Sequence, residues 1–320
     1  MSVKTKIWLI VAAFLVFVGL IIFGIVMIEY EWDFKKLSKT EYEENEYILN
    51  EKIQNISIVS DTADIVLVSS ENRKPSVFCY ESNNEKHTVY VKDGTLFIEL
   101  NVTKKWYDYI GINFGSPKVV LYLPEGEYGS LIVKSSTSDV EVPDVFQFED
   151  VYIAVSTGDV FCGSSVKGIA QIKASTGDIR IEGISAGLLD LTVSTGRIDV
   201  YDVICGGDLS VKVTTGKSAL TDVECLNFIS EGNTGDISMK NLVASRKISI
   251  ERSTGDVDFY SCDADEISVT TDTGDVKGSL CSDKIFFTQT DTGKVEVPKS
   301  PTGGKCEIIT DTGDIKITVG

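Results

Sequence analysis

The stretch ISIERSTGDVDFY at residues 248–260 contains the pattern that decides the fold. Apolar and polar side chains alternate on both sides of a Ser-Thr-Gly-Asp turn centred on Gly255. This period of two is typical of two short β-strands, each with one buried face. Glycine adopts a positive φ without a Cβ penalty, and the Asp that follows can bond to the local backbone. The stretch therefore predicts strand, tight turn and strand.

The same turn recurs along the second half of the chain at spacings of 19 or 20 residues, with its glycine at Gly158, Gly177, Gly196, Gly216, Gly235, Gly255, Gly274, Gly293 and Gly313. A segment that short cannot bury a core alone, so the repeat predicts solenoid coils that are stable only when stacked. We predict an all-β fold, a single-stranded parallel β-helix over residues 53–320. A right-handed coil is expected, although the repeat itself does not fix the hand. Residues 71–130 are expected to be irregular coils, with a hairpin turn at 91–94.

An uncharged apolar run at residues 7–28 is long enough to cross a bilayer as a helix. A cleaved signal peptide is the alternative, but its core is usually shorter and no Ala-x-Ala-like site follows this run. Lysines before the run and acidic residues after it predict a cytoplasmic tail at 1–6 and an extracellular C-terminal domain. We therefore expect a single-pass cell-membrane protein, with an acidic stalk at 29–52 between the membrane and the solenoid.

The formal net charge of −18 limits the partners that the chain can bind. A nucleic-acid-binding protein needs a basic patch, so we expect no nucleic-acid partner. The charge favours cations or cationic partners.

Cysteine and histidine usage gives no support for a metal centre or a catalytic triad. The chain has seven cysteines, no Cys-x-x-Cys and a single histidine, His87. Six cysteines fall on inward columns, where they are expected to be buried thiols. A bridge between Cys205 and Cys225, or between Cys262 and Cys281, stays conceivable because each pair occupies equivalent positions on adjacent coils. We expect no cofactor, no zinc site and no enzyme activity.

An aspartate follows many of the turn glycines, including Asp236, Asp256 and Asp275. One interpretation is calcium held between coils by carboxylate oxygens. The other is that these carboxylates cap the turns on a solvated edge. Calcium-binding solenoids use a nine-residue repeat that is richer in glycine, so the turn-capping interpretation is favoured.

Two further groups are candidates for binding. Trp106, Tyr107 and Tyr109 form an aromatic cluster that would either cap the first coils or offer a platform for a sugar or a partner. Ile315 and Ile317 belong to the last coil in the sequence, which is expected to be an open end. That end would dock a partner or a second copy by adding strands, or would simply fray.

The passage KVVLYLPEG…LIVKSSTSDVEV at 118–142 and the serial STGDI, STGDV and DTGDV turns resemble the bacterial putative-adhesin β-strand-repeat family, which includes LiaG-like proteins. The resemblance covers roughly residues 50–320. It implies an envelope-located β-solenoid beside a membrane anchor, linked in some members to envelope stress, with no catalytic residues to transfer. We therefore predict a non-catalytic surface interaction or envelope-stress module whose partner is an unknown envelope protein or glycan. The alternative is an enzyme acting on cell-wall or extracellular polysaccharide.

Overall fold

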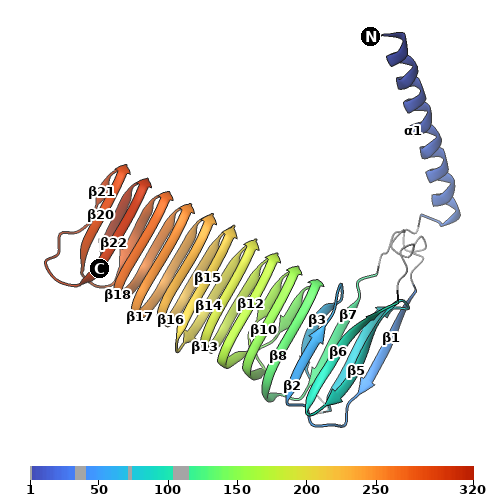
Figure 1. The fold of residues 1–320 in the computed structure, drawn as a ribbon, viewed down its shortest axis with the longest axis horizontal. Coiled ribbons are helices and arrows are strands. Elements are labelled where there is room, and N and C mark those ends of the chain that lie inside the picture. The colour runs from blue at the N-terminus through green and yellow to red at the C-terminus, as the bar shows by residue number, and fades with distance from the viewer. Residues whose placement is uncertain (1, 33–40, 71–73, 104–114) are drawn as a thin grey trace.

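The computed structural model describes residues 2–32, 41–70, 74–103 and 115–320, which form a helix and a long stack of strands (Figure 1). The elements are α1 Val3–Glu29, β1 Tyr42–Ile48, β2 Asn55–Val59, β3 Asp64–Ser69, β4 Ser76–Ser82, β5 Glu85–Lys92, β6 Thr95–Val102, β7 Lys118–Leu123, β8 Gly126–Thr137, β9 Val140–Val142, β10 Phe146–Thr157, β11 Val160–Cys162, β12 Ser165–Thr176, β13 Ile179–Thr195, β14 Ile198–Cys205, β15 Asp208–Thr215, β16 Ser218–Thr234, β17 Ile237–Thr254, β18 Val257–Thr273, β19 Val276–Leu280, β20 Lys284–Thr292, β21 Val295–Glu296, β22 Gly304–Thr312 and β23 Ile315–Val319.

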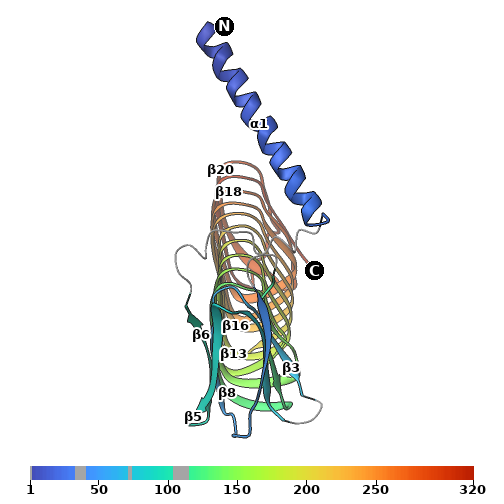
Figure 2. The same cartoon turned by 90° about the vertical axis from the view of Figure 1, so that its right-hand side faces the viewer.

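The strands confirm the predicted β-solenoid. Each coil has a pre-glycine face, made by the residues before the turn, and a post-glycine face, made by those after it. Equivalent residues of successive coils pair in parallel, as in Leu189 with Leu209 on the first face and Ile198 with Ser218 on the second. Figure 2 looks along the stack and shows the coils lying one behind another. The alternating apolar residues of both faces meet in one continuous core.

The turn glycines stack on a single edge, as the repeat predicts. The backbone N–H of Gly235 donates to the carbonyl of Thr254 in the next coil at 2.8 Å. Gly255 has a φ of +143°, and a Cβ there would lie 2.1 Å from the carbonyl oxygen of Gly235. Only glycine allows coils to approach this closely at the turn.

The N-terminal end of the solenoid departs from the parallel pattern. The coil made of β6 and β7 stacks outside the coil made of β2 and β3, although it follows it in the sequence. β4 then extends the post-glycine face antiparallel to β7, and β1 pairs antiparallel with β4. β5 extends the pre-glycine face antiparallel to β6. The predicted hairpin turn joins β5 to β6 with positive φ values at Asp93 and Gly94. The predicted stalk thus contains a strand, β1, whose backbone pairs with that of β4.

The C-terminal end also reverses the order of its coils, and here the sequence-based expectation is wrong. The coil of β22 and β23 lies between the coil of β18 and β19 and the coil of β20 and β21. Neighbours on both sides therefore cover Ile315 and Ile317, which are 0% and 3% exposed. The outermost coil is instead β20 and β21, where Phe287 is 54% exposed.

The N-terminal helix α1 is long and apolar enough to be a candidate membrane span over Lys4–Glu29. By length and composition alone, a signal sequence near the N-terminus satisfies the same test.

Candidate functional site

The carboxylates after the turn glycines form a hydrogen-bonded ladder between coils. Asp236 Oδ1 accepts the backbone N–H of Asp256 at 3.2 Å, and Asp256 Oδ1 accepts that of Asp275 at 2.9 Å. Lys217 Nζ lies 2.9 Å from the second oxygen of Asp236. Its hydrogen bond, followed by that of the Asp256 amide, lowers the pKa of Asp236. Lys277 Nζ lies 3.8 Å from Asp256 and 3.5 Å from Asp275. These contacts favour turn capping over calcium binding for the three candidates.

An acidic groove of about 520 Å³ lies on the post-glycine face, over β3, β7, β9, β11, β13 and β14. Carboxylates outnumber cations among its lining residues, which are Asp64, Val66, Lys118, Asp139, Val140, Glu141, Asp159, Val160, Phe161, Asp178, Arg180 and Asp199. Some of these carboxylates belong to the same ladder, as Asp139 accepts the N–H of Asp159 at 2.8 Å. Concentrated negative charge in a groove attracts cations and cationic chains.

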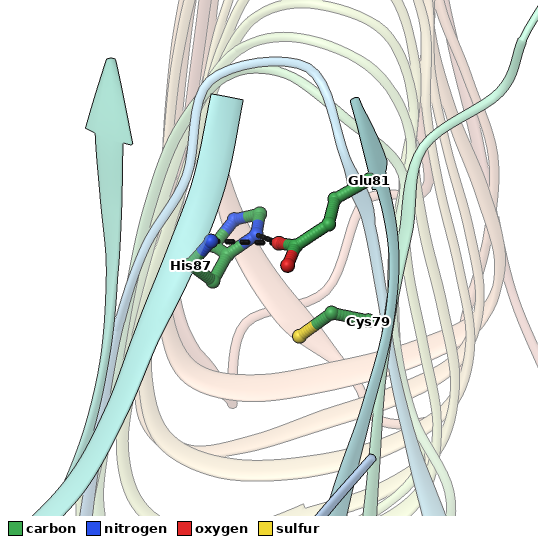
Figure 3. Close-up of side chains that lie close together, drawn as sticks. All are labelled: Cys79, Glu81 and His87. Atoms are coloured by element: carbon green, nitrogen blue, oxygen red, sulfur yellow. Dashed lines mark hydrogen bonds and ion pairs between the residues drawn. The ribbon is translucent and has the colours of Figure 1, made fainter. Parts of the chain in front are cut away.

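A cluster of three potential metal ligands is buried at the N-terminal end. Cys79 and Glu81 project from β4, and His87 projects towards them from β5 (Figure 3). Their exposed fractions are 0%, 1% and 4%. One ligand atom from each lies within 4.8 Å of the others. Burial of a carboxylate is costly unless the carboxylate is paired, so this cluster requires partners.

Hydrogen bonds supply those partners. Glu81 Oε2 lies 2.8 Å from His87 Nδ1 and accepts the His87 backbone N–H at 2.6 Å. Glu81 Oε1 accepts from Asn45 Nδ2 at 2.8 Å, and Ser60 Oγ lies 3.2 Å from His87 Nε2. Burial alone raises the pKa of Glu81, but the hydrogen bonds from His87 and Asn45 outweigh it and lower the pKa overall. Burial raises the pKa of the Cys79 thiol to about 12.

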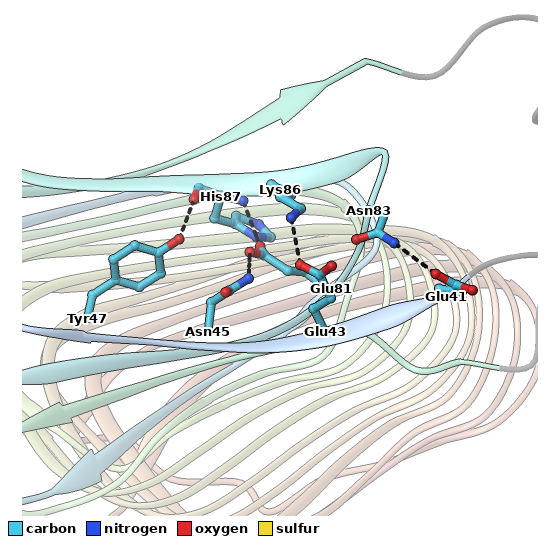
Figure 4. Close-up of polar contacts among 8 residues, drawn as sticks. All are labelled: Glu41, Glu43, Asn45, Tyr47, Glu81, Asn83, Lys86 and His87. Carbon is cyan, nitrogen blue, oxygen red and sulfur yellow. Dashed lines mark hydrogen bonds and ion pairs between the residues drawn. The ribbon is translucent and has the colours of Figure 1, made fainter.

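Contacts between β1 and the β4–β5 hairpin close the two faces of the solenoid over this cluster (Figure 4). Lys86 Nζ on β5 donates to Glu43 on β1 at 2.6 Å, and Tyr47 Oη donates to the carbonyl of His87 at 3.3 Å. Asn83 in the hairpin turn donates to Glu41 at 3.4 Å. The edge strands β1 and β5 are thus joined by side chains rather than by a backbone ladder.

The solenoid interior also holds a cation, Arg252, which is 2% exposed. Its Nη2 donates to Ser230 Oγ at 2.7 Å, while Nε and Nη1 have no hydrogen-bond partner in the described part of the chain. Gly232 makes room for the guanidinium, because a Cβ there would overlap Nη1. Burial lowers the pKa of Arg252 to about 10, against the effect of Asp236, so the group stays charged at neutral pH.

The binding candidates suggested by the sequence do not come together in one site among the described residues. Trp106, Tyr107 and Tyr109 lie outside the described residues. Ile315 and Ile317 are core residues. All seven cysteines are free, and Cys281 is exposed, contrary to its expected inward position. The buried cluster was not predicted from the sequence, because the repeat pattern suggests no partner for the single histidine, His87. A Cys-x-Glu spacing on one strand, with a histidine across a short turn, was the available signal.

The Toastrack DUF4097 family model matches residues 53–318. The solenoid is similar to a crystal structure of a putative adhesin from Bacteroides fragilis NCTC 9343, with 15% identity, a TM-score of 0.42 and coverage of 88% of this chain and 99% of the other. It is also similar to a putative lipid binding protein from Parabacteroides distasonis ATCC 8503 (16% identity, TM-score 0.44, coverage 87% and 97%). A putative adhesin from Parabacteroides merdae ATCC 43184 gives 12% identity, a TM-score of 0.48 and coverage of 87% and 96%. No curated protein matches the chain.

Proposed function

Since the chain belongs to the Toastrack DUF4097 family, we propose that it is a membrane-tethered, non-catalytic binding module that presents its solenoid outside the cell. In this proposal α1 remains uncleaved and spans the membrane with residues 1–6 in the cytoplasm. The acidic groove on the post-glycine face binds a cationic segment of an envelope protein, or a glycan that carries amino groups.

The acidic groove is the observation that carries this proposal. It lies on a rigid element, because its walls are strands held in register by parallel ladders. Several of its carboxylates are fixed by the amide of the next coil, so they do not have to be ordered when a partner binds. Phe161 adds an apolar surface among these charges. A rigid acidic groove with an aromatic side chain suits an extended cationic chain.

Binding of oligolysine to the full chain in lipid nanodiscs tests the groove. Glu141 lies on β9 in the groove and accepts no ladder amide, so Glu141→Lys reverses a charge without removing a turn cap. We expect this variant to weaken binding several-fold and to reduce its salt dependence. A second experiment measures binding in the same way, with fractions of the cell envelope in place of oligolysine.

The matched control is Glu224→Lys, which makes the same charge change at an exposed position of β16 outside the groove. It is expected to leave oligolysine binding close to that of the parent. Equal weakening by both variants would show that only the net charge of the protein matters, and the groove would then lose its role. Protease added to intact protoplasts tests the topology, because it should degrade the solenoid and leave α1 in the membrane.

A further inference from the structure

We propose that Cys79, Glu81 and His87 form a zinc site at the N-terminal end of the solenoid. Thiolate, carboxylate and imidazole are the three side-chain groups that bind Zn²⁺ in proteins, and three protein ligands leave a fourth position for water. The three donor atoms already lie within 4.8 Å of one another. This inference is independent of the acidic groove.

The strand geometry explains why these residues meet. Cys79 and Glu81 are two residues apart on β4, so both side chains point to the same side of the strand. The chain then turns between Ser82 and Glu85, which pair with each other, and carries His87 back on β5. Two ligands from one strand and a third from the next strand converge in the interior (Figure 3).

Two of the three donor groups are also held through their other atoms, which is the usual arrangement around a bound metal. Asn45 Nδ2 donates to Glu81 Oε1 at 2.8 Å, and Oε2, which accepts the His87 backbone N–H at 2.6 Å, keeps a second lone pair for the metal. Ser60 Oγ lies 3.2 Å from His87 Nε2, which leaves Nδ1 for the metal. These contacts limit how far the imidazole and the carboxylate can move.

The change needed to bind the ion is small. Tetrahedral bonds of about 2.0–2.3 Å place the ligand atoms roughly 3.3–3.7 Å apart. His87 Nδ1 and Glu81 Oε2, now 2.8 Å apart, would separate by about half an ångström, within ordinary side-chain adjustment. The Cys79 sulfur would move closer to both. Cys79 binds as the thiolate and releases its proton to solvent, and His87 binds as the neutral tautomer that carries its proton on Nε2, facing Ser60 Oγ.

A small cavity beside His87 lies next to an open groove. An outer groove of about 520 Å³ is lined by Tyr42, Thr62, Glu85 and Pro117, among others. The same four residues line a small inner cavity of about 10 Å³ that also touches His87. Ser82 lines this cavity too, and its buried Oγ has no partner among the described residues. The cavity is near the lower limit for one water, which would complete the coordination.

The test uses the full chain in detergent, reduced and stripped with a chelator, in a Cys281→Ser background that removes the exposed thiol. We expect Zn²⁺ to bind with one ion per chain in competition with a chromophoric chelator. We expect Co²⁺ to give thiolate-to-metal charge-transfer absorption and the visible bands of tetrahedral cobalt. Zn²⁺ should raise the melting temperature, because the ion binds the folded chain.

The decisive variant is Cys79→Val, which places on β4 the residue found at the paired position Val119. It should abolish the charge-transfer band and the thermal shift. Cys162→Val, also at a fully buried cysteine, is the matched control and should leave both intact. Asn45→Ala, which removes the contact to Glu81 without removing a ligand, should weaken Zn²⁺ binding by about 10- to 100-fold.

Glu81→Gln and His87→Gln keep the local shape and serve where Cys79→Val does not fold, as judged by circular dichroism and cooperative melting. Loss of one-to-one binding in either folded variant supports the site. Absence of Zn²⁺ binding by the parent, or a cobalt band that survives in folded Cys79→Val, overturns the proposal. The cluster is then a hydrogen-bonded network that closes the solenoid end.

Discussion

Replacing a turn glycine with alanine should destabilise the stack far more than the same replacement at a glycine with free space. Gly255 has a φ of +143°, and its new Cβ would lie 2.1 Å from the carbonyl oxygen of Gly235. Gly126 also has a positive φ, +152°, but nothing lies within 4 Å of its Cβ position. The pair separates backbone strain, common to both, from the steric overlap that only Gly255→Ala creates.

The magnitudes follow from these contacts. Backbone strain at a positive φ costs about 1–3 kcal/mol in either variant. Relief of the overlap at Gly255 requires the two coils to separate by about 1 Å, which breaks the bond from the Gly235 N–H to the carbonyl of Thr254, now 2.8 Å. A buried backbone group left unpaired costs a further 1–3 kcal/mol or so. We expect Gly255→Ala to cost about 2–6 kcal/mol and Gly126→Ala about 1–3 kcal/mol.

Native-state amide hydrogen exchange of the full chain measures this difference, because solenoid coils can open separately and a single melting temperature averages over them. The loss of protection in the β17 peptides of Gly255→Ala should exceed the loss in the β8 peptides of Gly126→Ala. Equal losses in the two variants would refute the argument that close approach of the coils, rather than φ alone, demands glycine at the turns.

Three further outcomes are expected. Asp256→Ala should lower the local protection against hydrogen exchange by about 0.5–1.5 kcal/mol. Asp256→Asn should lower it by less, since the amide oxygen still accepts the ladder N–H. Equal effects of the two variants would contradict the capping role. Burial raises the pKa of Asp263, but the hydrogen bond from Lys284 and the other hydrogen bonds to Asp263 lower this pKa overall. The stabilisation that Asp263 contributes should therefore be complete above its unfolded pKa near 4. It should be lost as the pH falls through the folded pKa. Protection measured against pH checks this, and the loss should be smaller in Lys284→Met, which keeps the hydrogen bonds from Ser282 and Ala264. Deletion of 304–320 should also expose the amides of 284–292, whose parallel partner is β22; retained protection would contradict the coil order.

Local chemistry made the repeat predictable. Alternation around Gly255 and its equivalents specifies the buried face and the turn together, and the hairpin at 91–94 follows from its Asp-Gly pair. The order of the terminal coils could not be predicted, because all coils share one register. Ile315 pairs with Val276 on one side and Val295 on the other, and either neighbour satisfies the same pattern. The periodic pattern therefore predicts the structure of each coil but not which coils are neighbours in the stack.

The buried cluster was not predictable for a related reason. Its members occur in the segment where the repeat is weakest, so no column marks Cys79 or Glu81 as inward. Their position depends on the antiparallel pairing of β4 with β7 and β1, which joins segments far apart in the sequence. The role of Asn45 depends on the same pairing, since β1 was expected to be part of a stalk. A local turn brings His87 back to Glu81, but only the long-range strand pairings bury the cluster.

The reversed order of the C-terminal coils has a mechanical consequence. In a solenoid whose coils follow the chain, a pulling force on the last coil peels it away by breaking hydrogen bonds along one flank. Here β22 and β23 are bonded on both flanks, to β18 and β19 and to β20 and β21. A force applied to β23 must therefore shear two ladders at once, and the load is shared by more bonds than in peeling. The reversed coil order therefore makes the C-terminal end of the solenoid harder to unravel.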